Sequence, residues 1–369
     1  MSKKPRVAIV YDWIDKWGGV ERVLLHLHEM IQTAVFYTSY VDYTHASWAD
    51  KLQIKTSFIQ QLPQCIRKSR IASLPLYPYA FESFNFSEYD VVISVTSSFA
   101  KGIVTKPRTK HICYLLTPTR FLWVFPDEYQ DNPFMKFIGA PLTNSLREWD
   151  FVAAQRPDTI IAISQTVADR AEKFYKRKAE VIYPGFDEDY WKAIGTNRGP
   201  SQQNKKYFLV VSRLEKYKKV DLVIEAFNKS GQNLWIVGTG SEEYKLQQMA
   251  HKNIHFLHSV TDGELAQLYS NATALIMPQE EDFGYVSLEA QFFGCPVIAY
   301  RRGGATETIQ EDKTGIFFNE QSVSSVLDGV ARFGQVSYNI CKSAQTQGPK
   351  QVSAFSRKIF EEKFHKLIY

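Results

Sequence analysis

The chain has 369 residues, of which 44% are hydrophobic and 22% charged; this composition is globular, and the length exceeds what one compact core usually holds, so two domains are expected. The formal charge of +5 is small, and lysine and arginine form no blocks interleaved with aromatic residues, which argues against nucleic acid and allows a weak preference for anionic membranes or substrates. No stretch approaches the ~18 apolar residues of a membrane-spanning helix, and Asp12 cuts short the apolar run after the basic start, so no signal peptide is expected.

The cysteines are scattered, with no C-x-x-C pair and no spacing typical of metal ligands. The simplest interpretation is that they are reduced, buried thiols, as in a reducing compartment. A cytoplasmic protein is therefore expected. The four are Cys65, Cys113, Cys295 and Cys341.

Short runs of β-branched and aromatic residues alternate with helical patterns through the first half. Near-continuous apolar runs are typical of strands buried on both faces, and their alternation with helices such as Val20–Ile31 and Thr166–Phe174 predicts a parallel sheet in an α/β domain. The predicted strands are Val7–Tyr11, Ala34–Thr38, Val91–Thr96, His111–Leu116, Thr159–Ser164 and Glu180–Tyr183.

This pattern stops at Tyr183–Phe186, and residues 187–206 are polar with no clear period, which predicts a hinge. A second α/β series follows, in which Thr261 and Glu264 have the spacing of a helix capping box. The second half is therefore predicted to be another doubly wound unit. Its predicted strands are Tyr207–Ser212, Asn233–Gly238, Ile254–His258, Ala274–Met277, Pro296–Tyr300 and Gly315–Phe318.

The last stretch, Val352–Ile368, has apolar residues at helical spacing and charges of both signs between them. This pattern predicts a terminal amphipathic helix that packs on the protein, and membrane binding is the less favoured alternative.

The stretch from Leu275 to Ile309 combines the features of a ligand site. An apolar strand breaks at Pro278, an acidic loop containing Glu281 follows, and a helical pattern carries Glu289. Two carboxylates that can bind hydroxyl groups are thus expected beside a helix N-terminus, where backbone N–H groups and the helix dipole favour a phosphate.

Other candidate residues also follow predicted strands. Arg213 and Lys218 can bracket a diphosphate, although a solvated basic loop explains them equally well. Gly18 and Gly19 would let an anion approach the backbone, and Gly238 ends a strand in the same way, but simple glycine turns are equal alternatives. Ligands bind at the carboxyl ends of strands in open α/β sheets, so position favours the functional interpretation.

Neither a metal nor a redox cofactor is expected. Asp282 lies beside Glu280 and Glu281, but no second acidic or histidine cluster accompanies them. The G-x-G-x-x-G spacing of a dinucleotide site is absent from the first glycine pair, and Gly303 and Gly304 are expected to be turn glycines.

Taken together, the motifs resemble those of retaining glycosyltransferases of family 4 (glycosyltransferase group 1). The likeness is strongest to mannosyltransferases of bacterial and archaeal surface-polysaccharide assembly, such as O-antigen or exopolysaccharide synthesis. The motifs, in chain order, are YDWIDKWGGVERVL, HICYLLTPTRFLW, SRLEKYKKVD, IVGTGSE and the E-x7-E of EEDFGYVSLEA. They cover nearly the whole chain.

The resemblance implies a GT-B fold, in which two Rossmann-like, doubly wound α/β domains face a central cleft. Residues 1–186 would form the acceptor-binding domain and residues 187–350 the nucleotide-sugar-binding domain. Residues 351–369 would form a terminal helix that packs back on the N-terminal domain.

The same resemblance implies roles for single residues. The catalytic set would be Glu281, which contacts the transferred sugar, and Arg213 and Lys218, which hold the donor diphosphate. Glu289 would accept hydrogen bonds from the ribose. The other donor-binding residues would be Gly18, Gly19, Gly238, Phe283, Gly284 and Tyr285, and the acceptor-side residues Trp17, Thr117, Arg120 and Trp123.

The sequence departs from the family pattern at two places. Related sequences often carry a histidine where this chain has Leu116, and another near Ser97. The departure puts any histidine contact to the donor in doubt, and it leaves room for a catalytically weak or inert protein.

The resemblance therefore implies a metal-independent, retaining hexosyltransferase without a cofactor. GDP-mannose is the expected donor, and a lipid-linked saccharide of cell-surface glycan synthesis, such as lipopolysaccharide, is the expected acceptor. Fixed cations and N–H donors would stabilise the leaving diphosphate. The alternatives are a UDP-sugar donor, an inert nucleotide-sugar-binding protein, and another GT-B enzyme such as an epimerase.

A basic flank precedes an apolar, aromatic run at Ile71–Phe81. Such a segment could dock peripherally on anionic lipid at the inner face of the cytoplasmic membrane. The alternative is that its apolar residues are core. The residues concerned are Arg67, Lys68 and Arg70 in the flank and Leu74, Leu76 and Tyr77 in the run.

Overall fold

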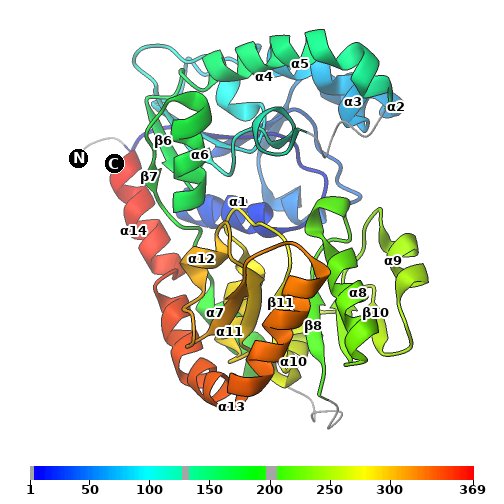
Figure 1. The fold of residues 1–369 in the computed structure, drawn as a ribbon. Helices are drawn as coiled ribbons and strands as arrows, with labels where there is room; N and C mark the ends of the chain where they lie inside the picture. The colour runs from blue at the N-terminus through cyan, green and yellow to red at the C-terminus, as the bar shows by residue number, and fades with distance from the viewer. Residues whose placement is uncertain (1–3, 127–132, 197–205) are drawn as a thin grey trace. The chain divides into compact units, whose positions relative to one another are not determined.

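The computed structural model describes residues 4–126, 133–196 and 206–369, and it divides the chain into two compact units (Figure 1). The first unit consists of Met1–Pro184 and Phe360–Tyr369, and the second of Gly185–Ile359. Each unit is a doubly wound, parallel α/β structure, so the predicted fold class is confirmed.

The first unit is built on a seven-stranded parallel sheet in the order β3-β2-β1-β4-β5-β6-β7. Strand order reverses between β1 and β4, which makes their carboxyl ends the topological switch point, where ligands bind in such sheets. The strands are β1 (Val7–Tyr11), β2 (Val35–Thr38), β3 (Ile54–Thr56), β4 (Val91–Thr96), β5 (Lys110–Leu115), β6 (Thr159–Ala162) and β7 (Glu180–Val181). The short edge strand β3 was not predicted.

Helices of several lengths connect these strands. They are α1 (Gly19–Met30), α2 (Gln64–Arg67), α3 (Arg70–Ser73), α4 (Tyr77–Glu82), α5 (Pro133–Ala153) and α6 (Gln165–Tyr175). Ser164 caps α6, because its side chain accepts a hydrogen bond from the N–H of Val167.

The second unit contains a six-stranded parallel sheet in the order β10-β9-β8-β11-β12-β13. Its switch point lies between β8 and β11. The strands are β8 (Phe208–Val211), β9 (Leu234–Val237), β10 (Ile254–Leu257), β11 (Ala274–Met277), β12 (Val297–Tyr300) and β13 (Gly315–Phe318). The apolar side chains of β11 are buried along its whole length.

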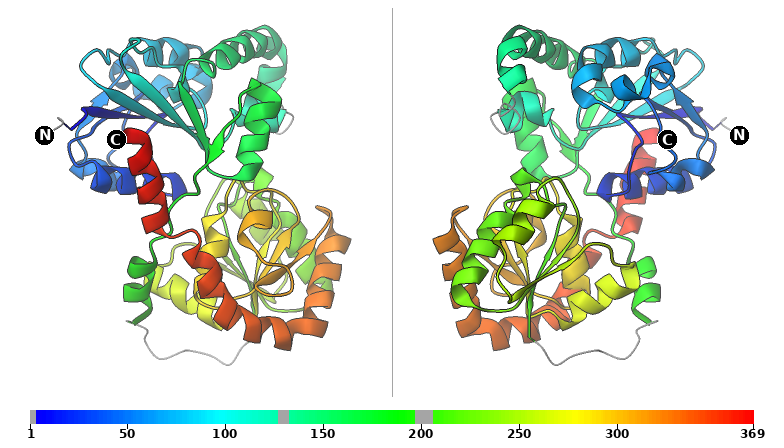
Figure 2. Two further views of the ribbon diagram at one scale, coloured as in Figure 1. Left: turned by 90° about the vertical axis from the view of Figure 1, so that its left-hand side faces the viewer. Right: turned by 90° about the vertical axis from the view of Figure 1, so that its right-hand side faces the viewer.

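Helices lie on both sides of this second sheet (Figure 2). Two of them, α8 and α13, share one apolar core with the strands. Thr261 and Glu264 form the predicted capping box at the start of α10. The helices are α7 (Glu188–Thr196), α8 (Val220–Ser230), α9 (Glu243–Met249), α10 (Asp262–Asn271), α11 (Tyr285–Phe292), α12 (Ala305–Thr308) and α13 (Val323–Ser353).

The stretch predicted to be a hinge contains a helix, because α7 occupies residues 188–196 of it. Trp191 is only 1% exposed and packs edge-on against Phe293, at 5.7 Å between ring centroids. The N–H of Tyr190 donates to the Asp187 carboxylate at 2.9 Å, which caps this helix. Trp191 thus attaches α7 to the second unit, although the polar composition of this stretch did not predict a helix. Residues 197–205 lie outside the described part of the chain.

The terminal helix begins later than predicted. Val352 belongs to the long helix α13, and α14 starts only at Arg357, as α14 (Arg357–Ile368). Phe360 and Phe364 are buried against Tyr114 of β5, at centroid distances of 6.0 and 5.1 Å. The apolar face of α14 is therefore part of the first unit's core.

The run Ile71–Phe81 lies partly in the core and partly at the surface, where Ile71 and Tyr79 are exposed. Leu74 and Tyr77 are buried, and the Arg70 guanidinium beside them lies 3.8 Å from the centre of the Trp13 ring. These residues therefore pack within their own unit, as in the core alternative. Among the described residues, no helix is long and apolar enough to cross a membrane.

All four cysteines are free, but they are not all buried. Cys113 and Cys295 are buried, Cys341 is half-buried, and Cys65 is exposed. The expectation of buried thiols is wrong for Cys65, which lies in the short helix α2, where no residue is buried.

A buried histidine in β5 predicts acid sensitivity. His111 is fully buried, its Nε2 lies 2.9 Å from the Ser94 hydroxyl, and burial lowers its pKa to about 3. In the unfolded chain, the same histidine has a pKa of about 6.5. Between about pH 6.5 and about pH 3, the unfolded state therefore binds more protons than the folded state, and the free energy of unfolding decreases as the pH falls. We expect the melting temperature to drop more steeply from about pH 7 to pH 5 in the wild type than in His111→Gln. Parallel pH profiles of the two proteins would contradict this.

Candidate functional site

The predicted donor residues gather at the switch point of the second unit. Arg213 and Lys218 follow β8, and Glu281 follows β11, the neighbouring strand in the sheet. The carboxyl ends of neighbouring parallel strands meet at one edge, so residues 63 positions apart in sequence come into contact.

Lys218 and Glu281 form the central contact of this site. The ammonium of Lys218 donates to Oε1 of Glu281, and the two side chains are only 10% and 17% exposed. The amide of Gln279 donates to the same oxygen at 2.9 Å. The ion pair is largely shielded from water, and Gln279 fixes the carboxylate of Glu281 with a second hydrogen bond. The pair is therefore held in one geometry, as a preorganised site requires.

Arg213 and Lys218 both contact Tyr217. The Arg213 guanidinium donates to the Tyr217 hydroxyl at 2.5 Å, and the Lys218 ammonium lies 5.2 Å from the centre of the Tyr217 ring. Tyr217 is the middle residue of the short 3₁₀ turn η7 (Lys216–Lys218). One tyrosine thus contacts both cations, of which Arg213 is exposed.

The acidic loop is fixed by its backbone. Gly304 donates its N–H to the carbonyl of Glu281 at 2.8 Å, and a Cβ on Gly303 would lie 2.2 Å from that same carbonyl oxygen. Gly303 also has a φ of +70°, which favours glycine. Gly303 and Gly304 thus allow the loop after β12 to approach the loop after β11 closely. This agrees with the prediction that they are turn glycines.

The remaining part of the loop leads into α11. Gly284 begins the helix with a φ of +86°, and Phe283 is buried against Phe355 at 5.7 Å between ring centroids. The Tyr285 hydroxyl donates to the carbonyl of Gly185 at 3.2 Å. The side chains of Phe283 and Tyr285 therefore have partners within the protein. The contact of residues 283–285 with the nucleotide-sugar donor stays a prediction, and it would be made by their backbone.

Glu289 contacts a tyrosine of α10. It is 4% exposed, and its Oε2 accepts a hydrogen bond from the Tyr269 hydroxyl of α10 at 2.9 Å. Its predicted contact with a ribose remains a prediction.

Gly238 has a packing reason to be glycine. Its φ is +138°, and a Cβ would lie 1.9 Å from the carbonyl oxygen of Ser212, at the end of the neighbouring strand. The glycine therefore allows the loops after β8 and β9 to touch. This packing agrees with the alternative that Gly238 is a simple turn glycine. The predicted contact of Gly238 with the sugar donor stays a prediction.

In the first unit, the predicted glycine turn opens α1. Gly18 precedes the helix in an extended conformation, and Trp17 before it is 50% exposed. The Trp17 ring packs edge-on against Trp48, at 6.1 Å between centroids. Behind the turn, the Glu21 carboxyl is 2% exposed, and burial raises its pKa.

Three of the four predicted acceptor-side residues follow β5, but their environments differ. Thr117 is 2% exposed, Arg120 is half-buried, and Trp123 donates its indole N–H to Asp150 at 2.8 Å. Leu116, where related sequences often carry a histidine, is buried. Ser97 lies beside the end of β4, half-buried.

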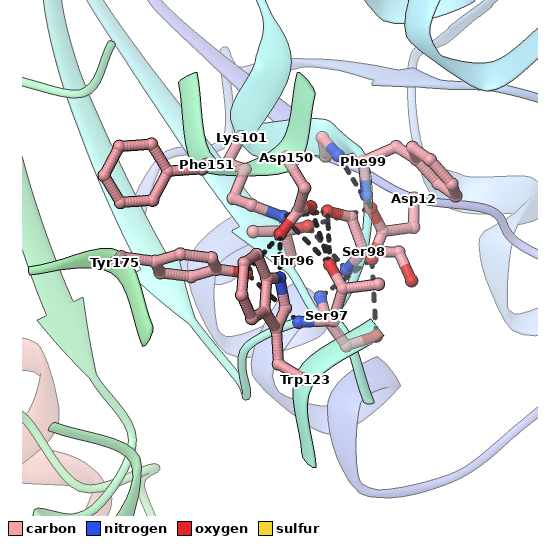
Figure 3. A network of polar contacts seen from close by, with 12 residues as sticks. Asp12, Thr96, Ser97, Ser98, Phe99, Lys101, Trp123, Asp150, Phe151 and Tyr175 are labelled. Atoms are coloured by element: carbon pink, nitrogen blue, oxygen red, sulfur yellow. Dashed lines mark hydrogen bonds and ion pairs between the residues drawn. The ribbon is translucent and has the colours of Figure 1, made fainter. Parts of the chain in front are cut away.

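Sequence reasoning missed Asp12 as a site residue. This buried carboxylate follows β1 at the switch point and accepts hydrogen bonds from the loop after β4 (Figure 3). The donors are the Thr96 hydroxyl at 2.9 Å and the backbone N–H groups of Ser97, Phe99 and Ala100, each at 2.8 Å. A buried charge is tolerated when it is so fully hydrogen-bonded. Its place directly after an apolar strand was the available signal.

A second buried carboxylate, Asp150 of α5, was also missed. It pairs with the Lys101 ammonium at 2.5 Å, and both side chains are at most 1% exposed (Figure 3). Lys101 belongs to the 3₁₀ turn η4 (Ala100–Gly102). A lone lysine within the otherwise apolar stretch from Phe99 to Val104 was the only signal in the sequence.

Across the described ranges, no group of three or more His, Cys, Asp or Glu side chains is placed to hold a metal ion. In the second unit, Lys218 pairs with Glu281, and Arg213 contacts the same tyrosine as Lys218.

Comparison with known proteins shows what the second unit is similar to. Residues 196–348 match the family "Glycosyl transferases group 1". The GDP-mannose-dependent alpha-(1-6)-phosphatidylinositol monomannoside mannosyltransferase of Mycobacterium tuberculosis is 30% identical over 201 residues, which are 47% of this chain and 52% of that protein. The chain thus spans about half the length of the curated relatives it matches.

Two solved structures share the fold over nearly the whole chain. Sucrose-phosphate synthase from Thermosynechococcus elongatus covers 98% of both chains with a TM-score of 0.73 and 16% identity. Anabaena HepE in complex with UDP and glucose covers 99% of both chains with a TM-score of 0.71 and 17% identity. Residues 196–348 are therefore similar to the glycosyltransferase group 1 family, and the chain has the two Rossmann-like domains of the GT-B fold.

Proposed function

We propose that the chain is a metal-independent, retaining glycosyltransferase that acts in the cytoplasm and transfers a hexose from a nucleotide sugar to a saccharide acceptor. The observation that carries the proposal is the Lys218–Glu281 pair at the switch point of the second unit. It joins a cation for a diphosphate to a carboxylate for sugar hydroxyls within one domain that matches the glycosyltransferase group 1 family.

The proposed reaction uses these groups as fixed charges. The bond between the sugar carbon and the donor phosphate breaks, a bond from that carbon to an acceptor oxygen forms, and the acceptor proton passes to the leaving phosphate. Negative charge grows on the diphosphate, which Lys218 and Arg213 would stabilise, while Glu281 would orient the sugar through its hydroxyl groups. Attack from the face that the phosphate leaves would retain the configuration.

GDP-mannose is the first candidate donor, because the mycobacterial relative is named for its dependence on it. A lipid-linked saccharide of cell-surface glycan synthesis is the candidate acceptor, since the same relative is named for acting on a phosphatidylinositol mannoside. A UDP-sugar is the second candidate donor, because the HepE structure with the same fold holds UDP and glucose.

A donor screen with the full chain tests the proposal. GDP-mannose and UDP-glucose are each incubated with and without a mannose disaccharide acceptor, in the presence and absence of EDTA. We expect acceptor-dependent nucleotide release that EDTA does not abolish, and a product whose anomeric configuration by NMR equals that of the donor.

Other outcomes point to the alternatives. Binding of a nucleotide sugar in a thermal-shift assay without release or transfer would indicate an inert binding protein. Conversion of the donor alone, without any acceptor, would indicate an epimerase. Inversion of configuration, or loss of activity with EDTA, would contradict the proposed mechanism.

A further inference from the structure

A buried polar contact joins the two helices that follow the site loops of the second unit. Helix α11 follows the loop that contains Glu281, and α12 follows the loop that contains Gly303 and Gly304. Where these helices meet, Ser287 of α11 and Thr308 of α12 are both fully buried, and their hydroxyl oxygens lie 2.8 Å apart. The two helices are therefore joined at this point by a directional hydrogen bond as well as by packing.

Each hydroxyl also reaches the glycine at the start of its own helix. The Ser287 hydroxyl lies 2.8 Å from the carbonyl oxygen of Gly284, and the Thr308 hydroxyl lies 3.1 Å from the carbonyl oxygen of Gly304. Because each hydroxyl has a single proton, one of them donates to the other, which in turn donates to its own glycine carbonyl. The link between the two helix starts is kept in either direction of this chain.

The amide of Gln291 joins the same two helices a second time. Its Nε2 donates to the backbone carbonyls of Ser287 at 3.0 Å and of Thr308 at 3.1 Å, and the side chain is fully buried. Ser287 and Gln291 are four residues apart, so they share the face of α11 that meets Thr308. Two sets of hydrogen bonds thus hold α11 and α12 in one relative position.

The starts of these two helices fix the backbone at Glu281. Gly304 donates its N–H to the carbonyl of Glu281 at 2.8 Å, and a Cβ on Gly304 would lie 2.5 Å from the Cα of Phe283. The two loops are therefore in direct backbone contact, and a shift of α12 against α11 would displace the loop of Glu281. Such a shift would change the distance from the Glu281 carboxylate to Lys218, which belongs to the separate loop after β8.

We propose that Ser287, Thr308 and Gln291 are positioning residues for Glu281, which set where its carboxylate lies relative to Lys218. The inference rests on the proposed transferase function, in which Glu281 orients the transferred sugar. A misplacement of about 1 Å at a reacting group can lower a rate by about 10²-fold, so a buried link remote from the sugar affects transfer. The three side chains are fully buried, and they act through Glu281 without touching the substrate.

The first experiment measures the positioning role without any activity. Backbone hydrogen exchange of residues 279–284 is compared in the wild type, in Ser287→Ala, and in the matched control Ser270→Ala. The Ser270 hydroxyl also donates to a carbonyl of its own helix, that of Ala266 in α10, at 2.8 Å, but this bond lies within one helix. We expect exchange of residues 279–284 to rise about ten-fold in Ser287→Ala and to stay at the wild-type rate in Ser270→Ala.

The second experiment separates positioning from a general loss of structure. Thr308→Val keeps the side-chain shape and removes the hydroxyl, whereas Thr308→Ser keeps the hydroxyl. Transfer is measured with GDP-mannose and with UDP-glucose, and binding of free GDP and UDP by calorimetry. We expect Thr308→Val to lower kcat about ten-fold and Thr308→Ser to stay within about two-fold of the wild type. The affinity for free GDP or UDP should stay unchanged in both variants, because these nucleotides carry no sugar for Glu281 to orient.

Several results would overturn the positioning role. They are unchanged exchange of residues 279–284 in Ser287→Ala, an equal rise in Ser270→Ala, and a wild-type kcat in Thr308→Val. A parallel loss of affinity for the free nucleotide in Thr308→Val would also overturn it, since it would indicate general damage to the second unit. A wild type that transfers no sugar from either donor would refute the proposed function, while the exchange measurement would still judge whether the buried link fixes the loop of Glu281.

Discussion

Replacing Lys218 with alanine is expected to lower kcat for sugar transfer by about 10²-fold or more, because loss of one preorganised charge-stabilising group typically costs that much. Lys218 is 8% exposed and paired with Glu281, so its ammonium is held in place before any substrate binds. The same loss is expected for Arg213→Ala and Glu281→Ala. Steady-state kinetics of nucleotide release in the presence of acceptor measures the effect.

Lys216→Ala is the matched control for Lys218→Ala. Lys216 lies in the same 3₁₀ turn, but its side chain is exposed, so its removal is expected to change kcat by less than about two-fold. Equal effects of the two substitutions would indicate that only the overall positive charge of the loop matters. Near-wild-type kcat in all three site variants would refute the assignment of the site.

Replacing Lys101 with methionine is expected to lower the free energy of unfolding of the first unit by about 3–5 kcal/mol, since it leaves a buried carboxylate without its counter-charge. The pair with Asp150 is almost completely shielded from water, with exposures of 1% and 0%. Three neutral donors would remain around Asp150, from Thr119, Trp123 and Tyr175, and they would not replace the charge. Chemical denaturation followed by circular dichroism measures the change.

The control for this substitution is Lys55→Met in the same unit. Lys55 pairs with Glu88 at 3.7 Å, and both side chains are about half exposed, so water already screens the pair. We expect a change below about 1 kcal/mol. A comparably small change for Lys101→Met would show that the buried pair contributes little to the stability of the unit.

The candidate site of the second unit was largely accessible from the sequence. Arg213, Lys218 and Glu281 each follow an apolar strand, and a parallel sheet brings the ends of its strands to one edge. What the sequence left open was which groups touch. Only the strand order, with β11 beside β8, shows that Lys218 pairs with Glu281 whereas Glu289 turns toward Tyr269.

The buried networks of the first unit were not accessible in the same way. The burial and hydrogen bonds of Asp12 and Asp150 have no local sequence pattern, because their donors lie 25 to 84 positions away in the chain. Similarly, one buried tryptophan, Trp191, stabilises a helix in a stretch whose polar composition predicted a hinge. Tertiary contacts overrode local propensity there.

The sequence by itself determined the two α/β units and the parallel strands, because near-continuous apolar runs such as Ala274–Met277 can be satisfied only between two layers of helices. It also placed the charged residues at strand ends. The tertiary structure alone decided which carboxylates are buried and paired. It also showed why Gly238 and Gly303 are glycine, since a side chain at either position would collide with a neighbouring loop. Those features depend on contacts between segments distant in the chain, and such contacts have no local pattern.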